Sequence, residues 1–508
     1  MLSYSWVIAL VGSVAFVVYR LYSSFKEDKA LQHIPTHEFE DGDNSRSRYM
    51  TDLKQLLETG YRKYNKQGQA FKVRVPIGGY SVKYRIILPK EHLEEIKHLS
   101  NSVFSWQLAS RVIFAQDYTG APDRGAWSGK ALRVGIHQNL AEITERLDHK
   151  ISEYFKAHLP QDKGQTASIR FMQFLVPAIG NVTNGLLVDE RLSSDPLWVK
   201  ETCEMAVNRY KSADDVRAWP PHLAALVSPM LESVKELRRS RAYVKMQMTP
   251  LFNDLRAREA LDPGEKKRAQ KGHYGFDWLW GGAPDSLTLD DFSDTMMRTL
   301  IASIHTTAKT ISVALIDLLS QPTYLHELLE EAKLAIRPDG SVYLDKLPMT
   351  DCFLKESQRL TPMFLLTMNR IVTSDYAFKS SGLEVPAKSM TTAASAAIAT
   401  DPDTFSDPNT FDGHRYWRLR QQDKGTASSL AMGMATTDSL GFGLGNQACP
   451  GRFFAVNEMK VVLARLLTGW NLTLEKNGVE YTGGRPEIGY NDFSLIAPVE
   501  WGVRLTKK

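Results

Sequence analysis

The chain has 508 residues, of which 43% are hydrophobic and 24% charged, as in an ordinary globular protein with a large core. Its formal net charge of +4 is small for this length and does not indicate a nucleic-acid partner. The three cysteines form no C-x-x-C pair, so a disulfide framework is not expected and a reducing compartment fits.

The N-terminus contains an uncharged apolar run from Trp6 to Tyr19. This run is short against the ~20 residues that span a bilayer, although flanking aromatic residues extend it. Because Arg20, Lys26 and Lys29 follow the run, the positive-inside rule predicts that the body of the protein lies in the cytosol. A cleaved signal peptide is the alternative, but no Lys or Arg precedes the run and no clear A-x-A site follows. We therefore predict a single-pass membrane anchor over residues 1–29.

The next part of the chain mixes helix and strand patterns. A helix is predicted over residues 49–64, and strand-like runs are predicted at residues 70–75 and 80–88. Residues 101–122 contain several aromatic side chains but little periodicity, so we expect mostly loop there. A charged helical pattern follows over residues 131–155.

A long helix is predicted over residues 288–320. It begins with the capping signal T-L-D-D and ends before Pro322. Ala302 and Thr306 are four residues apart and share a face. A small residue at this point lets a flat cofactor approach, and the Thr306 hydroxyl can donate a proton. The alternative is that Thr306 only donates back to the carbonyl of Ala302, as helical threonines often do.

The most unusual stretch is Leu440–Phe454, which reads LGFGLGNQACPGRFF and contains Cys449. A helix pattern follows, with Pro450 expected in its first turn and Glu458 on its polar side. Unpaired N–H groups and the positive end of the helix dipole would then favour the thiolate form of Cys449. A thiolate presented alone suits a cofactor that already brings four ligands of its own, as haem does. The alternative is a buried structural cysteine beside a glycine loop.

This stretch resembles the haem-ligand loop of the cytochrome P-450 family, whose pattern is F-x-x-G-x-(R/H)-x-C-x-G. Phe442, Gly445, Cys449 and Gly451 fall in register with that pattern. The family's basic residue, which usually reaches a haem propionate, is replaced by Gln447. Glutamine donates a hydrogen bond but brings no charge, so propionate binding must depend more on other residues.

The centre of the long helix, A-S-I-H-T-T, resembles the family's oxygen-activating motif A/G-G-x-D/E-T-T. The resemblance makes Thr306 the catalytic alcohol and places His305 where the acid usually stands. A histidine can relay protons near neutral pH. The alternative for His305 is a satisfied polar residue beside the site.

Other basic residues are candidates for the propionates. Arg370 opens a strand pattern that resembles the family's strand whose arginine grips a propionate. The family's W-x-x-x-R motif has no clean match in this sequence. By position, Arg133 or Lys130 is the candidate for binding a propionate in its place. A solvated helix face explains each of these two residues equally well.

Three residues resemble a structural network of the family. Glu356 and Arg359 match its E-x-x-R helix, and Arg415 matches the segment that supplies a second arginine. On spacing alone, an acid and a base three residues apart form an ordinary surface pair. The resemblance implies a buried ionic network that fixes the loop holding Cys449.

The resemblance implies a mainly α fold with a smaller β portion, in which residues 30–508 form one haem-thiolate catalytic domain behind the anchor. It implies haem b ligated by Cys449, dioxygen as cosubstrate, and electrons from NADPH delivered by a membrane-bound reductase. A cytochrome b-type protein is an optional second donor. The implied reaction is monooxygenation of an unactivated carbon. The implied location is the endoplasmic reticulum membrane, with the catalytic domain on its cytosolic face.

The segments I-H-T-T and A-C-P-G-R-F-F-A are similar to fungal microsomal members of the family that oxidise terpenoids, indole alkaloids and related secondary metabolites. This similarity implies a hydrophobic small-molecule substrate and no nucleic acid. One alternative is an enzyme of the same fold that catalyses oxidative ring closure, desaturation or isomerisation, with which His305 is compatible. Another is a haem-binding sensor that does not turn over, against which Thr306 and the basic flank of the anchor argue.

Overall fold

The computed structural model describes residues 26–75, 83–123, 125–425 and 427–508. The predicted membrane anchor lies outside these residues, apart from its basic flank at 26–29. The protein is mainly helical with smaller sheets, as the sequence predicts. Most of the buried hydrophobic side chains, from Leu31 to Leu505, form one contiguous cluster, and two small clusters lie apart from it.

The helices lie along the whole described chain. They are α2 (Arg46–Lys63), α3 (Lys90–Ile96), α4 (Trp106–Ile113), α5 (Gln116–Thr119), α6 (Ser128–His158), α7 (Phe171–Leu187), α8 (Glu190–Ser193), α9 (Pro196–Arg217), α10 (Pro221–Val227), α11 (Glu232–Leu261), α12 (Glu265–Ala269), α13 (Gly275–Gly281), α14 (Leu289–Leu319), α15 (Pro322–Ala335), α16 (Pro348–Leu360), α17 (Ser395–Ala399), α18 (Arg415–Gln422) and α19 (Arg452–Gly469).

The strands are short and fall mainly into two sheets. They are β1 (Phe71–Arg74), β2 (Tyr84–Ile87), β3 (Phe104–Ser105), β4 (Thr166–Arg170), β5 (Thr367–Val372), β6 (Tyr376–Ala377), β7 (Glu384–Val385), β8 (Met390–Ala393), β9 (Trp470–Lys476), β10 (Val479–Glu480), β11 (Tyr490–Asn491), β12 (Ser494–Leu495) and β13 (Trp501–Lys507).

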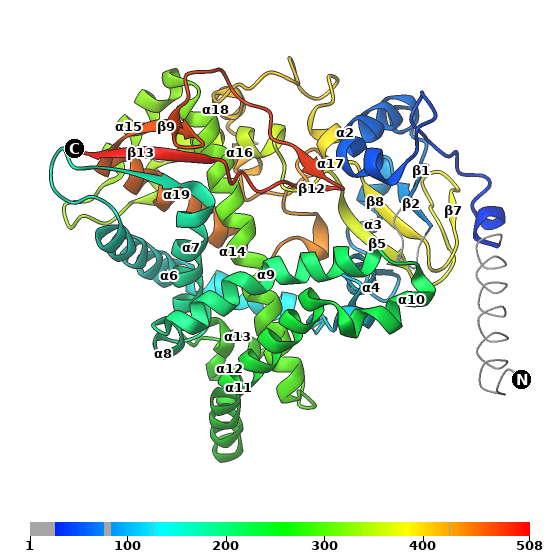
Figure 1. Ribbon diagram of the computed structural model, residues 1–508, viewed down its shortest axis with the longest axis horizontal. Coiled ribbons are helices and arrows are strands. Elements are labelled where there is room, and N and C mark those ends of the chain that lie inside the picture. The colour runs from blue at the N-terminus through cyan, green and yellow to red at the C-terminus, as the bar shows by residue number, and fades with distance from the viewer. Residues whose placement is uncertain (1–25, 76–82, 124, 426) are drawn as a thin grey trace, which may run out of the picture.

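The larger sheet has the strand order β1-β2-β8-β5-β3, and β2 and β8 run parallel. The other main sheet has the order β10-β9-β13-β4, with β13 antiparallel to both of its neighbours. Figure 1 shows the larger sheet on the right, close to α2, and strands β9 and β13 at the opposite end of the molecule. Helix α14 passes through the middle between them, so both ends of the fold are built around it (Figure 1).

Helix α14 has the boundaries that the sequence predicts. The Thr288 hydroxyl accepts from the backbone N–H of Asp291 at 3.1 Å, and the Asp291 carboxylate accepts from the N–H of Thr288 at 3.3 Å. This reciprocal cap satisfies two donors that would otherwise be unpaired. Among the described residues, α14 is the one helix long and apolar enough to cross a membrane, yet most of that apolar stretch is buried inside the protein.

The expectation of loop over residues 101–122 is wrong for much of that stretch. The short strand β3 pairs with β5, and helices α4 and α5 follow. Helix α4 begins because the Ser105 hydroxyl accepts from the backbone N–H of Leu108 at 3.1 Å. A helix of eight residues is too short for a clear periodic signal in the sequence. One side of the site described below is therefore a helix.

Candidate active site

A cavity of about 370 Å³ lies between α14, α4, β5 and the loop that precedes α19. Its wall is mainly apolar, and its size is typical of small-molecule sites. Five of the residues predicted from the sequence line it: Thr306, Arg370, Phe442, Gln447 and Cys449. These residues come from three separate segments of the chain, and the fold brings them around one space.

The loop before α19 presents Cys449 to this cavity. The backbone N–H of Cys449 donates to the carbonyl of Phe442 at 2.8 Å, which closes the loop on itself. At Gly445 the backbone is left-handed, with φ of 65°, and a Cβ would lie 2.0 Å from the carbonyl oxygen of Lys97. Only glycine fits there. The loop is therefore held against the end of α3 with its cysteine facing inward.

The predicted start of the helix after Cys449 needs correction. Helix α19 begins at Arg452, with Gly451 as its N-cap, so Pro450 lies outside the helix. Cys449 thus precedes the first helical residue by three positions instead of capping the first turn. The Arg452 guanidinium donates to the Cys449 carbonyl oxygen at 3.0 Å and brings a positive charge beside the cysteine.

The other two cysteines are not comparable donors. Burial raises the pKa of both Cys203 and Cys352 to about 12, so each stays a thiol, and neither lines the cavity. Within the described ranges, no group of three or more His, Cys, Asp or Glu side chains could hold a metal ion. Cys449 alone therefore suits a metal that brings its own equatorial ligands, such as haem iron.

Polar groups in the wall fit the carboxylates of a haem. The Arg370 guanidinium is buried, and it donates to the neighbouring carbonyl of Asn369 at 2.7 Å. Burial lowers the pKa of Arg370 to about 9, and no carboxylate among the described residues forms an ion pair with it. The Gln447 amide also lies in the wall, where its N–H donates to the carbonyl of Phe104 at 3.2 Å and its oxygen has no hydrogen-bond partner among the described residues. At Gly451 an added Cβ would meet no atom within 4 Å, so the space beside the loop is open.

The other two propionate candidates lie outside the cavity wall. Arg133 on α6 is exposed and donates to the backbone carbonyl of Asn446 at 2.8 Å. Lys130 is exposed on the same helix and does not line the cavity. The geometry thus favours Arg370 for the propionate and assigns Arg133 to holding the loop.

Replacing Arg370 with glutamine is expected to speed haem loss by roughly 10- to 100-fold, because a charged hydrogen bond contributes about 1.5–3 kcal/mol. The measurement is the rate of haem transfer to apomyoglobin. Lys130→Gln is the matched control, because Lys130 is exposed and does not line the cavity, and we expect haem loss from it close to the wild-type rate. Equal acceleration in both variants, or none in Arg370→Gln, would contradict the assignment.

Helix α14 turns Ala302 and Thr306 toward the cavity. The Thr306 hydroxyl donates to the carbonyl of Ala302 at 2.6 Å, so the back-bonded arrangement that the sequence left open is present. The hydroxyl still lines the wall, where its oxygen can accept a hydrogen bond. The Thr306 hydroxyl can donate a hydrogen bond into the cavity only after its side chain changes rotamer.

His305 does not reach the cavity. Its Nε2 lies 2.6 Å from the carbonyl oxygen of Cys203 on α9, and the residue does not line the wall. Burial lowers the pKa of His305, which favours the neutral ring with its proton on Nε2. The geometry therefore favours the satisfied polar contact between two helices over the predicted proton relay.

Glu458 is a buried acid that the sequence pattern placed on the polar side of its helix. The side chain is fully buried because α19 packs against α6, α14 and α15. No donor among the described residues is in hydrogen-bonding geometry with either carboxyl oxygen. Burial raises the pKa of Glu458 well above its usual range, and the Thr307 hydroxyl of α14 offsets this in part. Burial therefore favours the protonated form of this carboxyl, which lies beside Thr307, the residue that follows Thr306 in the sequence.

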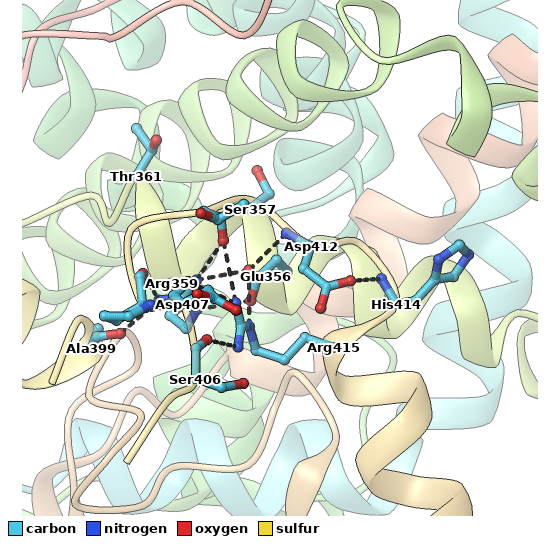
Figure 2. Close-up of polar contacts among 12 residues, drawn as sticks. Glu356, Ser357, Arg359, Thr361, Ala399, Ser406, Asp407, Asp412, His414 and Arg415 are labelled. Atoms are coloured by element: carbon cyan, nitrogen blue, oxygen red, sulfur yellow. Dashed lines mark hydrogen bonds and ion pairs between the residues drawn. The ribbon is translucent and has the colours of Figure 1, made fainter. Parts of the chain in front are cut away.

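The structure brings Glu356, Arg359 and Arg415 together, as Figure 2 shows. The Glu356 carboxylate accepts from Arg359 at 2.7 and 2.8 Å and from Arg415 at 3.2 Å. All three side chains are buried. Their remaining donors go to backbone carbonyls of Ala399, Ser406, Asp407, Pro408 and Thr410.

The network fixes the segment from residue 399 to 412 against α16, and among the described residues none of its hydrogen bonds reaches the Cys449 loop. The Asp412 backbone N–H also donates to Glu356 at 3.1 Å (Figure 2). Helix α16 reaches the loop through Gln358, whose amide lies so close to Gly441 that a Cβ there would collide with it. The network therefore supports the loop through the helix.

Comparisons with known proteins agree with this geometry. A sequence model of the family described as Cytochrome P450 matches residues 130–488. The chain is 29% identical over 486 residues to Cytochrome P450 monooxygenase ccsG of Aspergillus clavatus, covering 94% of each protein. It is 28% identical over 509 residues to Cytochrome P450 monooxygenase cheE of Chaetomium globosum, covering 97% of this chain and 94% of that relative. It is 27% identical over 494 residues to Pyrichalasin C-7 hydroxylase of Pyricularia grisea, covering 96% and 95%.

Proposed function

The chain belongs to the cytochrome P450 family of monooxygenases, and from this premise we propose that it oxidises a hydrophobic small molecule of fungal secondary metabolism. The observation that carries the proposal is the single Cys449 facing a mainly apolar cavity whose other wall holds Thr306. Hydroxylation is the favoured outcome, and a relative named as a hydroxylase of pyrichalasin supports it.

Cys449 would ligate the iron of haem b, and Arg370 would hold a propionate. Gln447 would join Arg370 by turning its amide N–H away from the Phe104 carbonyl. When bound, the haem supplies the redox chemistry, in which one atom of dioxygen enters the substrate and the other leaves as water. This reaction uses two electrons and two protons. We infer that NADPH supplies the electrons through a reductase, with a cytochrome b-type protein as an optional second donor.

The residues of this chain would position the substrate and manage protons. The aromatic and aliphatic wall would exclude water and hold an apolar substrate on the Thr306 side of the cavity. The Thr306 hydroxyl donates to the Ala302 carbonyl, and rotation of the side chain would free this donor for a hydrogen bond inside the cavity. His305 keeps its proton in the contact with Cys203.

Replacing Thr306 with alanine is expected to lower the rate of product formation by about 100-fold, the low end for loss of a proton donor. NADPH and dioxygen consumption should continue, so the product formed per NADPH falls. His305→Gln is the control, because a glutamine amide can also donate to the Cys203 carbonyl. We expect His305→Gln to form nearly as much product per NADPH as the wild-type protein. A loss in this variant as large as that in Thr306→Ala would instead support His305 as a proton relay.

The proposal also covers the membrane anchor and the domain organisation of the chain. Residues 1–29 would form a single-pass anchor in the endoplasmic reticulum membrane, and residues 30–508 would form one catalytic domain on its cytosolic face. The apolar run from Trp6 to Tyr19 and the basic residues after it support this orientation.

Product analysis with isotopically labelled dioxygen tests the proposal. The purified protein, a reductase and NADPH would be incubated with a panel of fungal terpenoids, alkaloids and polyketides, and products would be identified by mass. A product that gains one labelled oxygen atom supports monooxygenation. A product without the label would instead indicate ring closure, desaturation or isomerisation. The absence of substrate-dependent NADPH consumption across the panel would favour a haem-binding sensor.

A further inference from the structure

A tight turn between β11 and β12 presents an aromatic ring to the cavity. The two strands pair antiparallel, with Asn491 opposite Ser494. The two residues between them, Asp492 and Phe493, form the turn. The ring centroid of Phe493 lies 5.8 Å from that of Phe364, and both side chains line the cavity. The position of this turn therefore sets the position of an aromatic part of the cavity wall.

The backbone of the turn is strained at Asp492. Its φ is 51°, which lies in the left-handed region, where glycine is the usual residue of such turns. A strained residue persists where the surrounding contacts hold it, and such residues cluster at functional sites. Asp492 is also buried, whereas an aspartate in a turn is ordinarily solvated. An aspartate in place of glycine at this position indicates that its carboxylate has a role.

The carboxylate of Asp492 is bound by Arg85 of β2, which lies 407 residues earlier in the chain. The Arg85 guanidinium donates to the two carboxylate oxygens at 2.7 and 3.1 Å, and both side chains are buried. Two parallel hydrogen bonds fix the orientation of the carboxylate as well as its distance. The guanidinium carbon also lies 4.9 Å from the ring centroid of Phe493. One side chain of the larger sheet therefore contacts both residues of the turn.

Backbone hydrogen bonds connect the same two residues to other elements. The N–H of Asp492 donates to the carbonyl of Met50 on α2 at 2.8 Å. The carbonyl of Phe493 accepts from the N–H of Leu365, just before β5, also at 2.8 Å. The turn is thus held by the larger sheet, by α2 and by the segment before β5, and these contacts together keep the strained backbone in place.

We propose that Asp492 is a positioning residue, which acts through its ion pair with Arg85 to keep the Phe493 ring in the cavity wall, and that this ring determines which substrates fit. Neither Asp492 nor Arg85 lines the cavity, so their effect on a ligand passes through Phe493. Loss of the carboxylate would remove a group that the buried Arg85 binds, and the turn would shift to a less strained conformation. This inference rests on the proposed function, because the substrate would be oxidised in this cavity.

Two probes report the position of the ring, N-methylimidazole and N-(biphenylmethyl)imidazole. They differ only in the biphenyl group, and the imidazole of each ligates haem iron and shifts the Soret band of the holoprotein. We expect the wild-type protein to bind the biphenyl probe at least about tenfold more tightly, because its rings are buried against the apolar wall. Phe493→Ala should reduce this preference about tenfold, as expected for loss of an aromatic contact, with the affinity for N-methylimidazole unchanged.

The positioning role is tested by variants of the ion pair. Asp492→Asn should reduce the preference by a similar factor, because asparagine tolerates the left-handed backbone but carries no charge. Arg85→Lys keeps the charge and loses the two parallel hydrogen bonds, so we expect part of the loss. Asp492→Asn combined with Phe493→Ala should lose no more than Phe493→Ala alone, since the first change acts through the second residue.

Asp148→Asn is the matched control. The buried Asp148 accepts two hydrogen bonds from Arg465, each of 2.7 Å, and neither residue lines the cavity, so this variant should keep the wild-type preference. An unchanged preference in both Asp492→Asn and Arg85→Lys, or additive losses in the double variant, would overturn the positioning role. An unchanged preference in Phe493→Ala would overturn the role of the ring. The failure of N-methylimidazole to shift the wild-type band would overturn the proposed haem site, and this inference with it, whereas a shift leaves the haem site standing in every other outcome.

Discussion

Replacing Cys449 with serine is expected to reduce substrate-dependent NADPH consumption to background while leaving the protein folded. Serine has nearly the volume of cysteine, but its hydroxyl does not ionise near neutral pH and cannot give the electron-rich thiolate ligand. The measurement is NADPH and dioxygen consumption with reductase and substrate, at matched protein concentration.

Cys352→Ala provides the control for this change. Cys352 is buried, and its thiol has a pKa raised to about 12, so it takes no part in ligation. We expect this variant to retain turnover with a modest loss of stability from the small void. Substrate-dependent turnover in Cys449→Ser near the wild-type rate would contradict the assignment of Cys449 as the ligand.

Replacing Glu356 with glutamine is expected to destabilise the fold by about 3–5 kcal/mol, because two buried arginines would lose their shared counter-charge. Arg359 and Arg415 both donate to this carboxylate, at distances between 2.7 and 3.2 Å. The segment from residue 399 to 412 would loosen from α16, and haem incorporation should fall with it. The measurement is the free energy of unfolding in urea, together with the haem content after expression.

An exposed pair of the same spacing serves as the comparison. Glu330 and Lys333 also lie three residues apart on a helix, and both side chains are about half exposed. Glu330→Gln should change the free energy of unfolding far less than Glu356→Gln does, since surface ion pairs contribute little. If Glu330→Gln and Glu356→Gln lowered the free energy of unfolding by similar amounts, burial of the network would not explain its contribution to stability.

Residues of the site could be predicted where a short sequence motif identifies them. Cys449, Thr306 and the Glu356–Arg359 pair each sit in a short segment whose spacing fixes their neighbours. The capping signal at Thr288 similarly fixed the start of α14. Each of these predictions depends only on residues close together in the sequence, so it does not depend on how distant segments pack.

The direction of a side chain could not be predicted in the same way. Successive residues on a helix point about 100° apart, so the adjacent His305 and Thr306 cannot both face the same neighbour. Packing of α14 against α9 decides that His305 meets the Cys203 carbonyl, while Thr306 meets the cavity. The sequence contains no local signal for that choice.

Polar residues in buried places were also missed. Glu458 occupies a position that an amphipathic pattern assigns to solvent, but α19 is covered by other helices. Arg298 lies in a helical segment with an ordinary charged pattern, and only the packing of α14 near α4 places it in a cavity wall. The burial of such residues can be predicted only when the tertiary contacts between the helices are known.

The decisive measurement is the carbon monoxide difference spectrum of microsomes that contain the protein, reduced by NADPH through a reductase. Ligation by the Cys449 thiolate predicts a strongly red-shifted Soret band that develops on reduction. A band typical of imidazole ligation would contradict thiolate ligation, and the proposed monooxygenase chemistry of this cavity would fall with it.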